Sequence, residues 1–119
     1  MRSIKTKVVG VTFQNPNGIE RQSLLFVMQK RIKSDRGELI MLRRDHSNPH
    51  DKNAVAVLNG RGEQLGYLSR NVAKTIAPLM DKGTYISIKT LQITGGESRF
   101  LGLNVELEYV EAQLAATPF

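Results

Sequence analysis

The chain has 119 residues, the size of one folded domain, and we expect a single domain over residues 1–119. It contains no cysteine, which excludes disulfides, thiolate zinc sites and a cysteine nucleophile. Lys and Arg number 17 against 11 Asp and Glu, a formal net charge of +6, and the basic excess lies in the first 44 residues. This balance suits an anionic partner, most often nucleic acid, although a basic charge also serves simply to keep a small protein soluble.

No apolar run approaches the roughly 18 residues that a membrane-spanning helix needs. The longest candidate, residues 24–28, is followed at once by polar and basic residues. The first seven residues lead directly into a strand-like segment and lack the pattern of a signal peptide. We therefore expect a cytoplasmic protein with no membrane partner.

The first third of the chain predicts a strand, a turn and a helix. Residues 5–14 mix β-branched and polar residues and predict a strand, and residues 15–18, Asn-Pro-Asn-Gly, predict a turn. In residues 21–32 the apolar positions follow helical spacing, which predicts a short helix with Ser23 as its N-cap. Because that apolar run is short, a strand is the alternative interpretation there.

Five later segments carry the alternation or the continuous apolar run that is typical of strands, and Gly-rich or polar turns bound them. These predicted strands are residues 38–45, 54–59, 65–69, 84–93 and 99–110. The predicted turns and loops are residues 34–37, 46–53, 60–64 and 94–98, and residues 111–119 form a tail to which the pattern assigns no structure.

A second helix is predicted over residues 70–82, with Ser69 as its N-cap and Gly83 as its stop. Pro78 lies inside this pattern and should kink the helix or split it into two pieces, because proline removes a backbone donor. The sum is a mainly β protein with minor α content, with about six short strands and one or two short helices. Strands joined by tight turns favour a small antiparallel barrel, since closure removes exposed edges.

Residues 45–51 gather two histidines and two aspartates, which raises the possibility of a metal site. His46 and His50 have the i, i+4 spacing of helical ligands, but Pro49 makes this segment a loop, where that spacing has no geometric force. The chain offers no cysteine and no third histidine. We predict no metal and no cofactor.

The same loop could instead serve catalysis or binding. The chain contains neither a G-x-S-x-G motif nor a P-loop, so we predict that the protein is not an enzyme. If the loop forms a binding pocket, two roles for Asp51 are consistent with the sequence. It could cap the turn by accepting backbone N–H groups, or it could accept a hydrogen bond from a ligand hydroxyl. The residues alone leave these two readings open.

Four stretches read together resemble the HIRAN domain family. They are VVGVTFQNPNG followed by RQ, LIMLRRDHSNPHDKNAVAV, GEQLGYLSRNVAKTIAPLMDKG and a closing strand that contains Phe. The resemblance covers residues 7–107. It implies a six-stranded barrel related to OB folds with two short helices, and a groove that binds single-stranded DNA and captures a free 3′-hydroxyl end.

The resemblance also implies roles for single residues. Asp51 would accept the hydrogen bond of the terminal 3′-hydroxyl. His50 stands where the family usually has Tyr, and it could stack on the end nucleotide or bond to it. Tyr67 and Arg70 fall at positions that contact DNA, Arg70 through a phosphate.

Two further aromatic residues, Phe13 and Phe100, would pack on bases, although Phe13 and Tyr67 could equally be half-buried strand residues. The chain has Thr12 where end-binding members have Arg, and Gln14 where they have a second aromatic. Nearby cations could compensate for the missing arginine, namely Lys52, Arg43, Arg44 and Lys74, whereas Asn48 and Asn53 would shape the loop. The full set of predicted nucleic-acid-binding residues is Phe13, His50, Asp51, Lys52, Tyr67, Arg70, Lys74 and Phe100.

These observations predict a non-catalytic module that binds single-stranded DNA at 3′-hydroxyl ends, in DNA repair, replication or mobile-element biology. A helicase or nuclease on another chain would then supply catalysis. The alternative is a protein–protein interaction module that has the same barrel but no end recognition, and Thr12 and Gln14 favour it. An enzyme is the third option, which nuclease assays would test.

Overall fold

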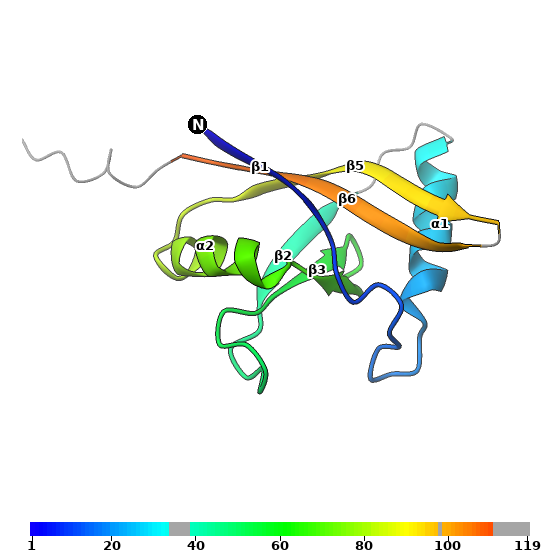
Figure 1. The fold of residues 1–119 in the computed structure, drawn as a ribbon, viewed down its shortest axis with the longest axis horizontal. Coiled ribbons are helices and arrows are strands. Elements are labelled where there is room, and N and C mark those ends of the chain that lie inside the picture. Colours follow the sequence, from blue (N-terminus) through cyan, green and yellow to red (C-terminus); the bar gives the residue numbers. More distant parts are fainter. Residues whose placement is uncertain (34–38, 98, 111–119) are drawn as a thin grey trace, which may run out of the picture.

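The computed structural model describes residues 1–33, 39–97 and 99–110 and shows six strands and two helices (Figure 1). In chain order these are β1 (Arg2–Lys7), α1 (Arg21–Lys33), β2 (Ile40–Arg44), β3 (Val55–Asn59), β4 (Gln64–Tyr67), α2 (Arg70–Asp81), β5 (Ser87–Gly96) and β6 (Arg99–Tyr109). The predicted mainly β fold is confirmed, and residues 21–33 form a helix rather than a strand. The predicted turn at 34–37 and the tail at 111–119 lie outside the described residues.

The strands form two three-stranded antiparallel sheets, with the orders β1-β6-β5 and β2-β3-β4. The chain after β1 connects the two sheets, because Val9 and Tyr67 exchange two backbone hydrogen bonds of 2.9 Å. A Cβ at Gly66 would overlap the carbonyl oxygen of Val9, so this close approach requires glycine. Within the described residues, the ladders do not run continuously around a closed barrel, in contrast to the closure that the strand pattern favoured.

The core lies between the two sheets and under the helices. Alternate residues of β6 from Leu101 to Tyr109 are buried, as expected for a strand with one face inward, whereas all five residues of β3 are buried. On α1, Leu25 and Met28 pack into this core. Each fully buried leucine contributes roughly 1.5–3 kcal/mol of hydrophobic free energy. None of the helices in the described ranges is long and apolar enough to cross a membrane.

The first strand ends earlier than the sequence predicted, at Lys7 instead of residue 14. Val9 is already paired with Tyr67 of the other sheet, and Gly10 follows with a φ of +74°, in the left-handed region that favours glycine, which turns the chain away from both sheets. Phe13 therefore lies in a bend beyond the strand, and the prediction that it belongs to a strand is wrong. At the other end of the chain, β5 continues through residues 94–96, which were predicted as loop.

The helix ends agree only partly with the predicted signals. Helix α1 begins at Arg21, so Ser23 lies inside it and is not its N-cap. Ser69 precedes α2 in extended conformation, but its side chain makes no capping hydrogen bond. Pro78 stands within α2, which continues past it as one helix, so the expected split does not occur. Gly83 ends the segment at a φ of +87°, as predicted.

Candidate nucleic-acid interface

The loop between β2 and β3 is built by its own side chains. Asn48 Oδ1 accepts hydrogen bonds from the backbone N–H of His50 at 2.8 Å and of Asp51 at 3.1 Å. Asp51 Oδ1 in turn accepts from the N–H of Asn53 at 2.9 Å. Asp51 thus caps the turn, as one reading of the sequence predicted. The described hydrogen bonds engage only Oδ1, so the second carboxylate oxygen remains available for a ligand.

Asp45 connects this loop to β4. The Tyr67 hydroxyl donates to Asp45 Oδ2 at 3.0 Å, and Asn48 Nδ2 donates to the same oxygen at 3.3 Å. Burial raises the pKa of Asp45, but hydrogen bonds from Tyr67, Asn48 and Ser47, together with the charge of Arg43, outweigh it and leave the pKa below its usual value. Asp45 is therefore ionised at neutral pH and holds the Tyr67 ring in place.

An open groove of about 400 Å³ lies where three segments meet. The segments are the turn after β1, the loop between β2 and β3, and the chain from the end of β4 into the first turn of α2; in Figure 1 the first two project on the same side of the molecule. Its lining residues are Val9, Gly10, Phe13, Asn48, His50, Asp51, Ala54, Tyr67, Leu68 and Arg70. The structure thus gathers five of the eight predicted residues, namely Phe13, His50, Asp51, Tyr67 and Arg70.

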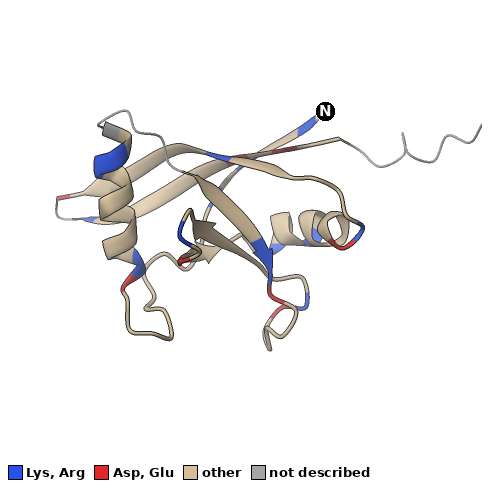
Figure 2. Cartoon of the chain, turned by 180° about the vertical axis from the view of Figure 1, so that it is seen from behind, with Lys and Arg blue, Asp and Glu red and all other residues tan. Residues whose placement is uncertain are grey.

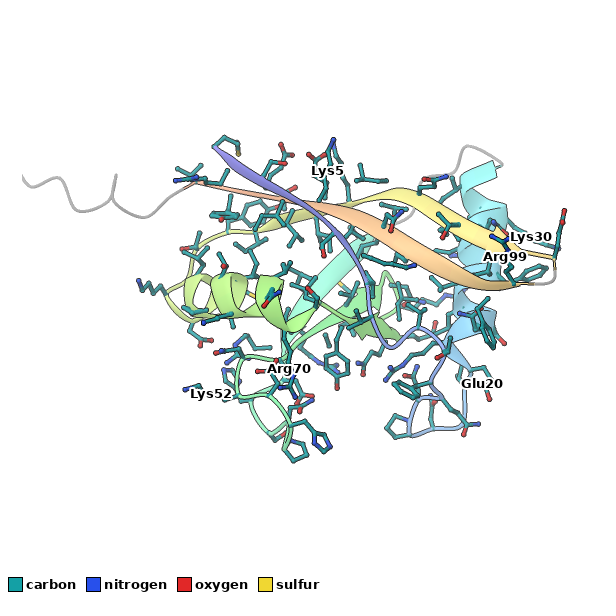
Figure 3. All side chains as sticks on the ribbon, viewed as in Figure 1. Lys5, Glu20, Lys30, Lys52, Arg70 and Arg99 are labelled. Atoms are coloured by element: carbon teal, nitrogen blue, oxygen red, sulfur yellow. The ribbon has the colours of Figure 1, made fainter. Side chains whose placement is uncertain are left out.

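The groove side chains differ in how firmly they are held. Phe13 is 65% exposed, so its ring is presented to solvent and the half-buried strand reading is wrong for it. Tyr67 is partly buried, and its hydroxyl is held by Asp45. Arg70 Nη2 donates to the carbonyl of His50 at 2.8 Å, which fixes the guanidinium beside the loop (Figure 3). The His50 side chain itself is exposed.

Three predicted residues do not line this groove. Phe100 is 74% exposed on β6, and its neighbour Arg99 lies at the hairpin end beside α1, far from Arg70 in Figure 3. Lys52 is exposed in the loop between β2 and β3, and Lys74 is exposed on α2. The structure supports none of these three as a groove contact.

Arg44, one of the cations proposed to compensate for the missing arginine at position 12, is engaged in contacts within the protein. Arg44 bonds to Asp81 through Nε at 3.0 Å and to the carbonyl of Ala54 through Nη1 at 2.7 Å, so it joins β2 to α2 and to the loop. Figure 2 shows both acidic and basic positions on the loop between β2 and β3, so this wall of the groove has no single sign.

Sequence reasoning missed two contributors to the groove. Asp45 was considered only as a metal ligand, and its contact with Tyr67 joins the end of β2 to β4 across the sheet, which no local motif reveals. Arg21 is buried behind Tyr67, with its guanidinium carbon 5.8 Å from the centroid of that ring. The available signal was an arginine in the first turn of a helix, where it opposes the helix dipole.

The His and Asp residues of the loop are not arranged as metal ligands. In the part of the chain that the structure describes, no three His, Asp or Glu side chains are grouped closely enough to hold an ion. His46 instead lies 3.4 Å from Asp81 of α2, measured from Nε2 to Oδ1.

Fold and site together define a small mainly β domain in which two loops and a helix start frame an open groove. The sequence model of the HIRAN domain family matches residues 1–110. The chain belongs to the HIRAN domain family.

Curated relatives match over a short segment. Helicase-like transcription factor of Oryctolagus cuniculus and that of Homo sapiens are each 46% identical over 44 residues, which is 37% of this chain and 4% of theirs. A Fanconi-associated nuclease 1 homolog of Arabidopsis thaliana is 38% identical over 45 residues, 38% of this chain and 5% of the relative. The match thus spans only a small part of each of these long proteins.

Solved structures show the same fold. The crystal structure of the HIRAN domain of human HLTF has a TM-score of 0.59 at 24% identity, covering 90% of this chain and 74% of that one. A protein from Lactobacillus plantarum has a TM-score of 0.57 at 21% identity, covering 89% and 97%. The HLTF HIRAN domain in its DNA-bound conformation has a TM-score of 0.53 at 24% identity, covering 90% and 73%.

Proposed function

We propose that the groove binds single-stranded DNA and receives the 3′-hydroxyl end of the strand. The observation that carries this proposal is the meeting of an exposed ring, a partly free carboxylate and an anchored guanidinium in one groove, contributed by Phe13, Asp51 and Arg70. The DNA-bound conformation described for the HLTF HIRAN domain supports DNA as the ligand.

Each side chain has a chemical task in this proposal. Phe13 stacks on a base, which contributes roughly 1–3 kcal/mol without regard to sequence. Arg70 attracts a backbone phosphate. Asp51 accepts the terminal hydroxyl through its second oxygen, and hydrogen bonds to charged groups contribute about 1.5–3 kcal/mol. The same negative charge repels a terminal phosphate, so the groove prefers a hydroxyl end.

The module needs no catalysis of its own in this proposal. It would bring a helicase or nuclease on another chain, or elsewhere in a longer chain, to a DNA end during repair or replication. The names of the relatives, helicase-like transcription factor and Fanconi-associated nuclease 1 homolog, support that context. Incubation of labelled DNA with the protein and Mg²⁺ or Mn²⁺ should leave the DNA intact, and metal-dependent cleavage by purified wild type that Asp51→Ala lacks would contradict this view.

Fluorescence anisotropy at low salt tests the DNA proposal, with 5′-labelled oligonucleotides that end in a 3′-hydroxyl or a 3′-phosphate. We expect binding to both, with the hydroxyl end at least about tenfold tighter, which corresponds to about 1.4 kcal/mol. Equal affinity for the two ends would contradict end recognition. Absence of binding at low salt would contradict the DNA proposal as a whole.

A protein-interaction module is the second candidate, and a separate groove favours it. This groove, of about 530 Å³, lies between α1 and the end of the β5–β6 hairpin, where Phe26 and Val27 are about half exposed. Because these residues lie outside the DNA groove, Phe26→Ala should leave DNA affinity unchanged. If wild type binds no DNA, this second function becomes the leading one.

A further inference from the structure

Arg21 is a buried cation that has no anionic partner among the residues that the structure describes. Only 6% of the surface of Arg21 is exposed. Nε donates to Asn15 Oδ1 at 2.7 Å, Nη1 donates to the carbonyl of Gly10 at 2.8 Å, and the guanidinium lies over the ring of Tyr67. These three partners, all of which belong to the described residues, are uncharged. Buried charges are normally paired with an opposite charge, because desolvation is costly.

The charge persists in spite of burial. Desolvation lowers the pKa of Arg21, and Tyr67 partly opposes that shift. Arginine has so high an intrinsic pKa that it remains protonated in proteins. A positive charge therefore lies over the ring of Tyr67, a groove-lining residue, and no carboxylate in the described residues is paired with it.

The contacts of Arg21 reach two parts of the groove, the turn after β1 and Tyr67 of β4. Gly10 belongs to the turn that presents Phe13, and a Cβ at Gly10 would lie 3.3 Å from Arg21 Nη1 and 3.5 Å from the Phe13 ring. Asn15, also buried, donates from Nδ2 to the carbonyl of Gln64 at 2.9 Å and so ties the same turn to β4. One guanidinium thus fixes the turn that carries Phe13 relative to the strand that carries Tyr67.

We propose that Arg21 is a positioning residue for the groove, which holds the turn that carries Phe13 and the ring of Tyr67 in a fixed relative position. In this proposal, a bound DNA backbone supplies the negative charge that the guanidinium lacks. The inference rests on the proposed DNA function. It assigns the task of the absent arginine at position 12 to a buried arginine on α1, in place of the exposed lysines. A lysine cannot replace it fully, because a point charge lacks the planar fork that serves Gly10 and Asn15 together.

Two substitutions separate geometry from charge. Arg21→Lys keeps the charge but loses the fork, and Arg21→Met loses both. Arg61→Met is the matched control, since Arg61 is exposed in the turn between β3 and β4, outside the groove. Each variant is checked by thermal unfolding in circular dichroism, and its affinity for a 5′-labelled single strand with a 3′-hydroxyl is measured over a range of salt concentrations.

We expect Arg21→Lys to bind several-fold more weakly with the wild-type salt slope. Arg21→Met should bind at least tenfold more weakly and with a shallower salt slope, because a positive charge close to the bound strand is lost together with the fork. Arg61→Met should bind within about twofold of wild type, since surface charges outside the contact add little. Folded Arg21 variants with wild-type affinity and slope would overturn the inference.

A measurement on wild type covers the case in which Arg21→Met does not fold. The Nε–Hε resonance of Arg21 in a ¹⁵N spectrum should shift on titration with the single strand, while that of Arg61 should not. An unchanged Arg21 resonance alongside confirmed DNA binding would overturn the inference. Failure of the proposed function looks different, because wild type itself would then bind no DNA.

Discussion

The two walls of the groove are built in different ways. The loop between β2 and β3 is held by hydrogen bonds that span two or three residues, from Asn48 to His50 and Asp51 and from Asp51 to Asn53. The turn after β1 is held from a distance, by Arg21 and Gln22 of α1. The turn of one wall is therefore shaped by its own residues, and Tyr67 and Arg70 attach it to β4 and α2. The other wall depends on the packing of a helix against the sheets.

The largest expected effect on stability comes from removing the hydrogen bonds by which Gln22 of α1 supports the turn after β1. Gln22 Nε2 donates to the carbonyls of Val11 at 3.0 Å and Leu101 at 2.9 Å, and its Oε1 accepts from the N–H of Leu101 at 2.7 Å. Gln22→Leu leaves three partly buried backbone groups unpaired, so we expect the free energy of unfolding to fall by about 3 kcal/mol. Urea denaturation measures this, and a loss below about 1 kcal/mol would show that the turn stands without α1.

Phe13→Ala removes the aromatic ring that the turn after β1 presents to the groove. Because the ring is 65% exposed, the unfolding free energy should change little, while affinity for single-stranded DNA should fall by about 1–3 kcal/mol. Anisotropy and thermal unfolding on the same sample check both halves. Unchanged affinity would show that Phe13 is a surface residue with no part in binding.

Asn48→Ala removes the acceptor that shapes the loop between β2 and β3. Two backbone N–H groups lose their acceptor, so we expect a loss of about 1–2 kcal/mol in unfolding free energy. Hydrogen exchange should quicken at His50 and Asp51 while the amides of β3 stay protected, because the damage is confined to the loop. Exchange that quickens throughout β3 would mean that this wall, too, is coupled to the core.

The smallest effect concerns Asp45, whose pKa is lowered in the folded state. A carboxyl with a depressed folded pKa stabilises the fold above its unfolded pKa of about 3.9, and this stabilisation is lost as the pH falls through the folded value. Asp45→Asn should therefore be slightly less stable than wild type at pH 7, with the difference shrinking below about pH 4. A difference in melting temperature that is independent of pH would contradict this.

The same contrast explains what the sequence could predict. Alternation and turn residues located six strands and two helices, and the Asn48–Asp51 segment indicated its own turn, because these signals are local. The contacts of Arg21 join α1 to the turn after β1 and to β4, and the bond from Tyr67 to Asp45 joins β4 to the end of β2. These residues are far apart in the sequence, so no pattern of spacing contains the contacts. The first strand was predicted too long because β-branched residues continue past Lys7, where the pairing with β6 ends and the chain crosses to β4 before it turns at Gly10.

Phe100 shows a related limit. Its strand was predicted from alternation, and its exposure agrees with that pattern, but alternation does not say which surface feature an exposed residue joins. The structure places it outside the groove that Phe13 and Tyr67 line. The resemblance therefore predicted the strand that carries Phe100 but not the surface that this residue joins.

The most direct test of the central claim is the ratio of affinities for 3′-hydroxyl and 3′-phosphate single strands, measured for wild type and for Asp51→Asn. The asparagine can still accept the N–H of Asn53, so the turn is kept while the charge is removed. We predict that wild type prefers the hydroxyl end by at least about tenfold and that Asp51→Asn loses most of this preference. A wild-type ratio near one, or a ratio that Asp51→Asn leaves unchanged, would contradict the claim that this groove recognises a DNA end.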